Sequence, residues 1–259
     1  MDEALTINAA KESGERMVSL LGLSAPPVGV RFITGKEYAT GGAKKLSRHR
    51  YCQALMKARR GSNVTLDGEE LSCPAAAAAF GFRPLPKGLQ SGQGLVGFGI
   101  VSDHKVGERM FRYMPKLEPG SVLQLHLFPL DKAQYIPDVV VVEDEIEKLM
   151  WIVLAYLHAT NGERVMASTS VLQAVCVDAT IVPYIDKRLN FGYGCYGCRD
   201  ATDIGPNETV LGFPGHMLPG IMSHLEFLTG KAIPASRCKR AWQALQHEDS
   251  NRTSVENRL

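Results

Sequence analysis

The chain has 259 residues, of which 45% are hydrophobic and 22% are charged. This length lies near the upper limit for one hydrophobic core, and the composition is that of a globular protein. The 29 basic and 27 acidic residues leave a formal net charge of +2. Because basic side chains form no stripe with interleaved aromatic residues, the sequence argues against a nucleic-acid partner.

The N-terminal segment is acidic and amphipathic and lacks the basic and then apolar order of a signal peptide. The longest apolar run, Leu149 to Leu157, has nine residues, whereas a helix that crosses a bilayer needs about 20. We expect this run to be a buried core helix. The sequence therefore predicts a cytoplasmic protein without a membrane partner.

Hydrophobic periodicity and turn residues predict helices and strands that alternate along the chain. Helices are expected at residues 4–22, 47–61, 73–82, 107–114, 145–161, 170–187 and 215–230. Strands are expected at residues 25–33, 63–72, 94–103, 121–130, 137–145, 164–169 and 208–214. The 121–130 strand alternates as a half-buried strand does, and the valine run at 139–142 indicates a strand buried on both faces. The mixture predicts an α/β or α+β fold, with a mixed sheet covered by helices.

We expect one compact domain at residues 1–235 and a polar C-terminal tail at 236–259. A weak internal similarity divides the domain into halves at 1–120 and 121–235. Gln53-Ala54 and Gln173-Ala174 each begin a predicted helix, and a cysteine follows 20 and 22 positions after the glutamine. A duplication would bring the two cysteine-bearing turns together about a pseudo-twofold axis.

Two stretches match the G-x-G-x-x-G pattern, GQGLVG at 92–97 and GYGCYG at 192–197. Neither lies between a hydrophobic strand and a helix, as a dinucleotide-binding loop must. Gly194 and Gly197 are better explained as residues that let the backbone fold tightly around the neighbouring cysteine sulfurs and donate amide hydrogens to them.

Four cysteines are candidate metal ligands. Cys195 and Cys198 form C-x-x-C, a spacing that lets two thiolates reach one metal, and Cys73 precedes Pro74 at the start of a predicted helix. Cys52 also lies near a helix N-terminus, although core packing explains it equally well. Cys176 lies in an apolar helix where core packing is expected, but it could replace Cys52 or Cys198.

Soft thiolate ligands without clustered histidines favour an iron–sulfur cluster, 4Fe-4S in type, with zinc as the alternative. A zinc ribbon would need a second C-x-x-C pair, and the sequence has none. A redox dithiol wants C-x-x-C at the start of a helix, but the residues after Cys198 predict turns. If three cysteines bind, one iron is left open to polarise a substrate.

Two further residues are candidate catalytic groups. Arg199 follows the C-x-x-C pair directly and could stabilise an anionic cluster, clamp a substrate carboxylate or pair with Asp200 on the surface. His216 lies in a turn between a predicted strand and helix, where functional side chains often occur.

The order of motifs resembles the family of domain of unknown function 169 (DUF169). The matching stretches are PPVGVRFI, C-Q-A-x-x-x-A-R-x-G, a second cysteine before a small-residue helix that reaches FGF, PDVVVV, a turn ending in GCR, and GFPGH. The resemblance spans about residues 10–235. It implies a soluble prokaryotic protein, common in anaerobes and archaea, without an assigned activity. In that family the turn often has a single cysteine, so Cys198 departs from the pattern, while Cys52, Cys73 and Cys195 match it.

Three hypotheses follow from the sequence. The first is an iron–sulfur enzyme, a lyase, hydratase or oxidoreductase, that acts on a small anionic or sulfur-containing substrate or exchanges electrons with a partner. The second is a non-catalytic carrier of a metal or cofactor, and the third is a protein stabilised by zinc or without metal. Homo-oligomerisation stays open under each of them.

Overall fold

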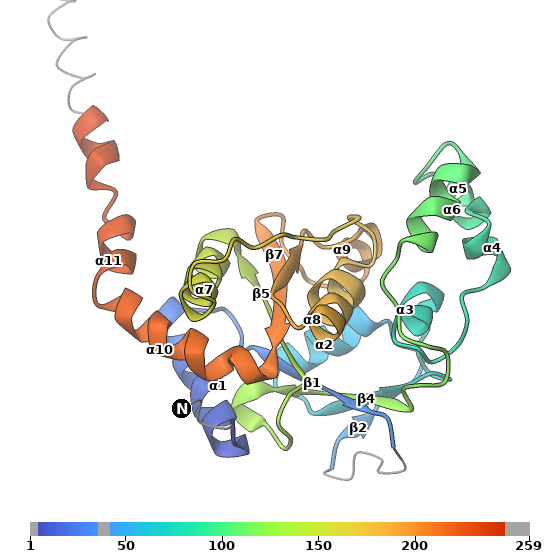
Figure 1. The fold of residues 1–259 in the computed structure, drawn as a ribbon, viewed down its shortest axis with the longest axis horizontal. Coiled ribbons are helices and arrows are strands. Elements are labelled where there is room, and N and C mark those ends of the chain that lie inside the picture. The colour runs from blue at the N-terminus through green and yellow to red at the C-terminus, as the bar shows by residue number, and fades with distance from the viewer. Residues whose placement is uncertain (1–4, 36–41, 247–259) are drawn as a thin grey trace, which may run out of the picture.

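A computed structural model describes residues 5–35 and 42–246. A seven-stranded mixed sheet, in the order β2-β3-β4-β1-β5-β7-β6, forms its centre (Figure 1). The strands are β1 Val28–Ile33, β2 Lys44–Lys45, β3 Val64–Asp67, β4 Gln124–Pro129, β5 Val139–Glu145, β6 Asn190–Gly192 and β7 Glu208–Pro214. Neighbouring strands pair antiparallel except β2 and β3, which are parallel. The predicted α/β class with a mixed sheet is confirmed.

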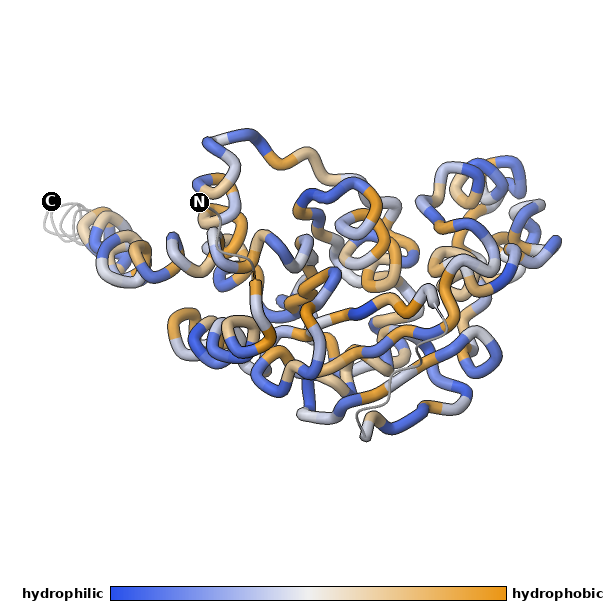
Figure 2. The backbone as a smooth tube through the Cα atoms, turned by 60° about the horizontal axis from the view of Figure 1, so that its bottom comes forward, coloured by the Kyte–Doolittle hydropathy of each residue, from blue (hydrophilic) through white to orange (hydrophobic). Residues whose placement is uncertain are grey.

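Helices cover both faces of the sheet and enclose two apolar cores. One face carries α1 (Ile7–Leu21), α7 (Ile146–Ala159) and α10 (Leu218–Thr229). The other carries α2 (Tyr51–Arg59), α3 (Pro74–Ala79), the π-helix η2 (Ala174–Ile181), α8 (Val182–Asp186) and α9 (Tyr196–Ala201). The valines of β5 alternate between the cores, as the period of two in a strand requires, and Figure 2 shows hydrophobic stretches running through the centre of the molecule.

The two halves of the sheet share an order of five elements, although β2 belongs only to the first half and α7 and α8 only to the second. β1, α2, β3, α3 and β4 form the first half, and β5, η2, β6, α9 and β7 form the second. The strand orders β3-β4-β1 and β5-β7-β6 meet at the antiparallel pair of β1 and β5, so a pseudo-twofold axis passes between them. The duplication expected from the cysteine spacings stays a prediction. Because β4 belongs to the first half, the halves meet between Lys132 and Val139 rather than at residue 120.

The first half carries an insert that the second half lacks. Between α3 and β4 lie α4 (Lys87–Gln90), α5 (Gln93–Gly97) and α6 (His104–Arg112), whereas α9 is joined to β7 through residues 202–207 alone. The strand predicted at 94–103 is therefore wrong. Gly92, at φ 75°, brings the start of α5 so close to α6 that a Cβ atom would lie 1.9 Å from the His104 carbonyl oxygen. This close backbone contact favours a helical pair over an extended strand.

Two other strand predictions need correction. Residues 164–169 form no strand, because the Asn190 side-chain amide bonds both the N–H and the carbonyl of Ser168, at 2.8 and 2.9 Å, in place of a backbone ladder. β4 is buried along its whole length rather than half-buried, since helices and loops cover both of its faces. The predicted core helix α7 leaves Met150 and Leu154 exposed on its outer face.

The π-helix η2 lies directly on the sheet. A Cβ atom at Gly212 of β7 would lie 1.8 Å from the Ala179 carbonyl oxygen, so only glycine permits this contact. The helix predicted over 170–187 begins at Ala174, after left-handed backbone at Val171 (φ 61°) and Gln173 (φ 56°), and changes to α-helix near Pro183. Left-handed backbone at a β-branched residue is uncommon and marks a strained entry into this helix.

The chain leaves the body of the molecule after α10. α11 (Ala232–Arg237) and the helical residues 240–246 extend away from the sheet, and residues 236–246 are exposed (Figure 1). The remainder of the predicted tail, 247–259, lies outside the described residues. Within the described part, none of the helices combines the length and the apolar character that a bilayer crossing demands.

Candidate functional site

Five cysteines line a single cavity of about 270 Å³, which we call the cysteine pocket. Cys52 comes from α2, Cys73 precedes α3 and Cys176 lies in η2, while Cys195 precedes α9 and Cys198 lies within it. Each half of the sheet thus contributes sulfur atoms. The sixth cysteine, Cys238, is exposed at the end of α11 and does not line the cavity.

The cysteines at positions 73 and 195 occupy matching places in the two halves. Each is the N-cap residue of a six-residue helix, α3 or α9, on the same face of the sheet. The sequence predicted turns after Cys198, but residues Tyr196–Ala201 form α9, in which Thr202 Oγ1 donates a hydrogen bond to the Cys198 carbonyl at 2.7 Å. C-x-x-C therefore does stand at the start of a helix, and the sequence-based argument against a redox dithiol does not hold.

Sulfur atoms lie within contact distance in the pocket. Cys195 Sγ is 3.0 Å from Cys198 Sγ and accepts a hydrogen bond from the Cys198 backbone N–H at 3.3 Å. This sulfur separation is too long for a disulfide, whose S–S bond measures about 2.05 Å. Cys176 Sγ donates to the Gln173 carbonyl at 3.5 Å. The five side chains are thiols, and none of them is joined in a disulfide.

The environment of these thiols disfavours the thiolate. Burial, with the neighbouring sulfurs of Cys73, Cys195 and Cys198, raises the pKa of Cys176. The hydrogen bond with Cys198, together with burial, raises the pKa of Cys195. At Cys198 the hydrogen bond to Cys195 lowers the pKa, but contact with the Cys52 thiol and burial outweigh it and raise the pKa to about 12. The thiols are poor nucleophiles as they stand, and metal binding must release protons from them.

The donor set of the pocket consists of soft sulfur atoms. No carboxylate and no imidazole is among the residues that line it. Across residues 5–35 and 42–246, no three histidine, cysteine, aspartate or glutamate side chains are already arranged around one ion. The sulfurs must therefore turn about their Cα–Cβ bonds to share a metal. Such a donor set suits zinc or an iron–sulfur centre better than hard cations.

Helix α2 is fastened to α9 at its N-terminal end. Arg50 Nη1 donates to the Gly197 carbonyl at 2.9 Å, and Gln53 Nε2 donates to the Ala201 carbonyl at 3.3 Å. These bonds join the helix that carries Cys52 to the helix that carries Cys198. Gly197 itself lines the pocket, as expected for a residue beside the sulfurs.

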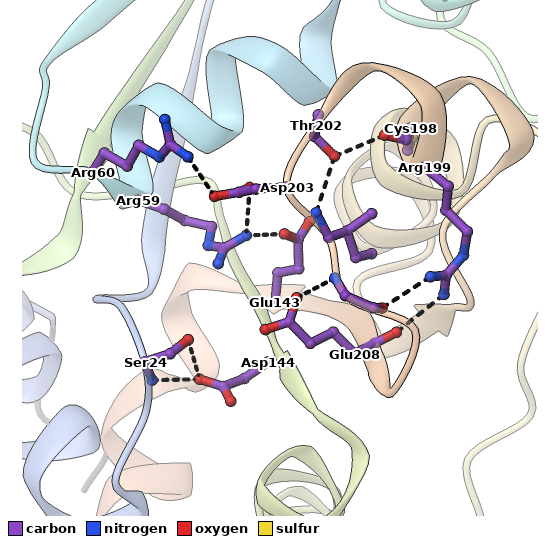
Figure 3. Close-up of polar contacts among 12 residues, drawn as sticks. Ser24, Arg59, Arg60, Glu143, Asp144, Cys198, Arg199, Thr202, Asp203 and Glu208 are labelled. Carbon is purple, nitrogen blue, oxygen red and sulfur yellow. Dashed lines mark hydrogen bonds and ion pairs between the residues drawn. The ribbon is translucent and has the colours of Figure 1, made fainter.

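Ion pairs fasten the other end of α2 (Figure 3). Arg59 pairs with Glu143 of β5, and both side chains are nearly buried, with 10% and 5% of their surface exposed. Arg59 also lies 3.7 Å from Asp203, which follows α9, and Arg60 binds Asp203 at 2.8 Å. α2, the centre of the sheet and the C-x-x-C segment are thereby held in one arrangement.

The structure places the two candidate catalytic residues outside the cysteine pocket. Arg199 binds the carbonyl oxygens of Gly205 at 2.9 Å and Glu208 at 3.1 Å, and also that of Tyr193, so it braces the loop between α9 and β7. His216 is exposed in the 3₁₀ turn η3 (Gly215–Met217) at the end of β7. Neither residue lines the cavity.

Gly194 has φ 79°, a backbone angle that favours glycine, and a Cβ atom there would lie 3.0 Å from Ile204 Cδ1. The residue thus shapes the turn before Cys195 without lining the pocket.

Asp178 is a buried acid near the site that sequence reasoning did not single out. Its side chain is 3% exposed within η2, and Thr169 Oγ1 donates to its Oδ2 at 2.6 Å. Burial raises the pKa of Asp178 to about 7, against the lowering effect of Thr169, and the Cys195 sulfur adds to the rise. The sequence feature that could have indicated a buried acid is the single aspartate within the apolar run VLQAVCVDATIV. π-Helical segments are often found at functional sites.

The sequence model of the DUF169 family, described as "uncharacterised ArCR", matches residues 16–224. The chain belongs to the DUF169 family. The resemblance predicted from the cysteine and glycine motifs is thereby confirmed. The matched range of the DUF169 protein includes all five cysteines of the pocket and both halves of the sheet. No curated protein and no solved structure is similar enough to the chain to count as a match.

Proposed function

We propose that this DUF169 protein binds an iron–sulfur cluster of the 4Fe-4S type in the cysteine pocket. One observation carries the proposal: five of the six cysteines, supplied by both halves of a pseudo-symmetric sheet, line the same cavity. Isolated buried cysteines behave as small hydrophobic residues and need no common location. Convergence from positions as distant as 52 and 198 is expected where the sulfurs have a shared ligand.

The size and the donors of the pocket favour a cluster over a single zinc ion. Four thiolates close a tetrahedron around zinc at about 2.3 Å and leave no cavity. The cysteine pocket has five sulfurs and about 270 Å³ of space, more than one ion occupies. Zinc held by four of the five cysteines is the alternative, and metal analysis separates the two.

Cys73 and Cys195 are the primary ligands under this proposal because they hold equivalent positions on the two sides of the pseudo-twofold axis. Cys198 and Cys52 complete the set, with Cys176 able to replace either of them. When bound, the cluster supplies an electron carrier or, with three ligands, a Lewis-acid iron. The Arg50 guanidinium at the rim lies where it would balance the negative charge of the thiolates.

Anaerobic purification followed by iron and acid-labile sulfide analysis tests the proposal. We expect a brown protein with about four irons per chain. Cys73→Ser and Cys195→Ser should each lose most of the iron and the visible absorbance while their circular dichroism stays that of the wild type. Cys238→Ser, at an exposed cysteine outside the pocket, is the matched control and should keep both. Full iron content in Cys195→Ser, or one zinc per chain without sulfide, would overturn the assignment.

A redox dithiol is the second candidate, and one observation favours it. Cys195 and Cys198 form C-x-x-C at the start of α9 with their sulfurs 3.0 Å apart. The raised pKa of both thiols counts against it, because thiol exchange needs a thiolate. Mass spectrometry after titration with oxidised glutathione is the test. A Cys195–Cys198 disulfide that forms reversibly in an iron-free, colourless protein would favour this candidate over the cluster.

A further inference from the structure

The insert of the first half forms one wall of the cysteine pocket. Leu89, Leu95, Phe98, Ile100 and Phe111 come from this insert and line the cavity opposite the sulfur-bearing elements. In Figure 1, α4, α5 and α6 gather beside α3 at the end of the molecule opposite α11. The insert contributes no sulfur, nitrogen or carboxylate ligand to the pocket. Its contribution is therefore a wall, and not a metal ligand.

This wall is apolar, although the insert is rich in charge elsewhere. A second cavity of about 370 Å³, which shares Phe111 with the cysteine pocket, is lined by charged side chains that include Glu108, Arg112 and Lys116. None of these charged residues lines the cysteine pocket. The insert thus directs its hydrocarbon side chains to the sulfurs and its charged side chains away from them.

Arg50 is the one residue with a formal charge at pH 7 among those that line the cysteine pocket. Its guanidinium already donates to the Gly197 carbonyl at 2.9 Å and lies 3.5 Å from an Asp200 carboxylate oxygen. A charged group placed against the buried side chains of Leu95 and Phe111, away from Arg50, would lose its hydration without gaining an ionic partner, which is costly. An uncharged ligand loses little and gains the burial of apolar surface.

We infer that the space between the insert and the sulfurs is a binding chamber for a small, uncharged molecule with an apolar body. This inference rests on the proposed function in one respect: it takes the sulfur wall as the side on which chemistry occurs. It replaces the anionic substrate expected from the sequence with a neutral one. It also gives a role to the insert, which has no counterpart in the second half of the sheet.

A series of ligands of equal chain length tests the charge preference. The probes are 1-hexanol, hexanoate and hexylammonium, and their binding is measured by saturation-transfer NMR on anaerobically purified protein and on metal-free protein. We expect 1-hexanol to bind at least about tenfold more tightly than either ion, because the apolar wall gives no compensation for lost hydration of charge. Equal affinity for the three probes, or no binding of 1-hexanol to either form, would overturn the inference.

A substitution in the wall tests the location. Phe98 lines the pocket and is 67% exposed, so Phe98→Asp places a carboxylate in the wall without removing a buried core residue. We expect it to weaken 1-hexanol binding about tenfold or more and Phe98→Leu to change it little. The matched control is Tyr113→Asp, at a 76% exposed aromatic residue outside the pocket. Unchanged binding in Phe98→Asp contradicts the location.

Iron and sulfide are measured in the same samples, so the two proposals fail separately. If the wild-type protein binds 1-hexanol but no iron, the chamber is supported and the cluster is contradicted. If it carries four irons but prefers hexanoate, the cluster is supported and the chamber is contradicted.

Discussion

The Arg59–Glu143 pair predicts a large and specific loss of stability on substitution. Both side chains are nearly buried, at 10% and 5% exposure, and the pair joins α2 to the middle of the sheet. Arg59→Met keeps an unbranched apolar stem but removes the guanidinium and leaves the Glu143 carboxylate buried without its partner. Removal of one member of a buried ion pair costs about 3–5 kcal/mol. Asp203, at 3.7 Å from Arg59 and 38% exposed, is itself an acid and cannot neutralise the Glu143 carboxylate.

The size of the effect can be checked by urea denaturation of the metal-free protein in reductant, monitored by circular dichroism. We expect Arg59→Met to lower the free energy of unfolding by about 3–5 kcal/mol without changing the slope with urea. Arg59→Met combined with Glu143→Leu removes the unpaired carboxylate and should recover most of the loss. Recovery distinguishes an uncompensated buried charge from lost packing of the arginine stem.

The adjacent arginine gives the matched control. Arg60 binds Asp203 at 2.8 Å, but its side chain is 63% exposed, so Arg60→Met should cost less than about 1 kcal/mol. If Arg59→Met costs no more than Arg60→Met, the reasoning from burial is refuted. A double variant as unstable as Arg59→Met would refute the assignment of the loss to the Glu143 charge.

Two further predictions concern the sheet. His126 of β4 is fully buried with neither ring nitrogen hydrogen-bonded in the described part of the chain, and burial lowers its pKa to about 4. The imidazole has a pKa of about 6.5 in the unfolded chain, so the unfolded state binds the proton first as the pH falls. The free energy of unfolding should therefore be highest above pH 6.5 and fall by about 3 kcal/mol between pH 6.5 and 4. His126→Phe should remove this part of the pH dependence of unfolding. Gly212→Ala would place a Cβ atom 1.8 Å from the Ala179 carbonyl oxygen and should cost more than about 3 kcal/mol in thermal or urea unfolding. Gly97→Ala, where no atom lies within 4 Å, is its control and should stay within about 1 kcal/mol of wild type; equal losses at the two glycines would contradict the close contact of η2 with β7.

The sequence predicted best those features that depend on a strong local pattern. The valine run of β5 alternates between two apolar cores, as a strand covered on both faces must. The C-x-x-C spacing and the place of Cys73 before Pro74 indicated a shared sulfur site, and Cys73 and Cys195 lie at the N-caps of two short helices around one cavity. In both cases the residues that form the sequence pattern are also the residues that pack in the core or line the cavity.

The features that the sequence did not predict depend on contacts between distant segments. The stretch 94–103 has the composition of a strand, but the contact of Gly92 with the backbone of α6 makes it part of a helical insert. Arg199 carries a charge beside the cysteines, but its guanidinium donates hydrogen bonds to three backbone carbonyls and stabilises a loop. No local sequence pattern indicates these contacts. The backbone carbonyls of helix α9 also accept hydrogen bonds from the side chains of Arg50 and Gln53, which lie more than 140 residues away in the sequence.

The pseudo-twofold arrangement and the insert that departs from it suggest how structure and chemistry divide in this fold. Matching elements of the two halves bring Cys73 and Cys195 to the same place, and the bonds from α2 to α9 fix the distance between the cysteines that each half adds. A symmetric core of this kind can hold a ligand on its axis, but it presents the same surface from both sides. The α4–α6 insert breaks that equivalence with an apolar wall on one side of the sulfurs. If the pocket binds the neutral molecule proposed above, this wall would let that molecule approach the sulfurs from one direction.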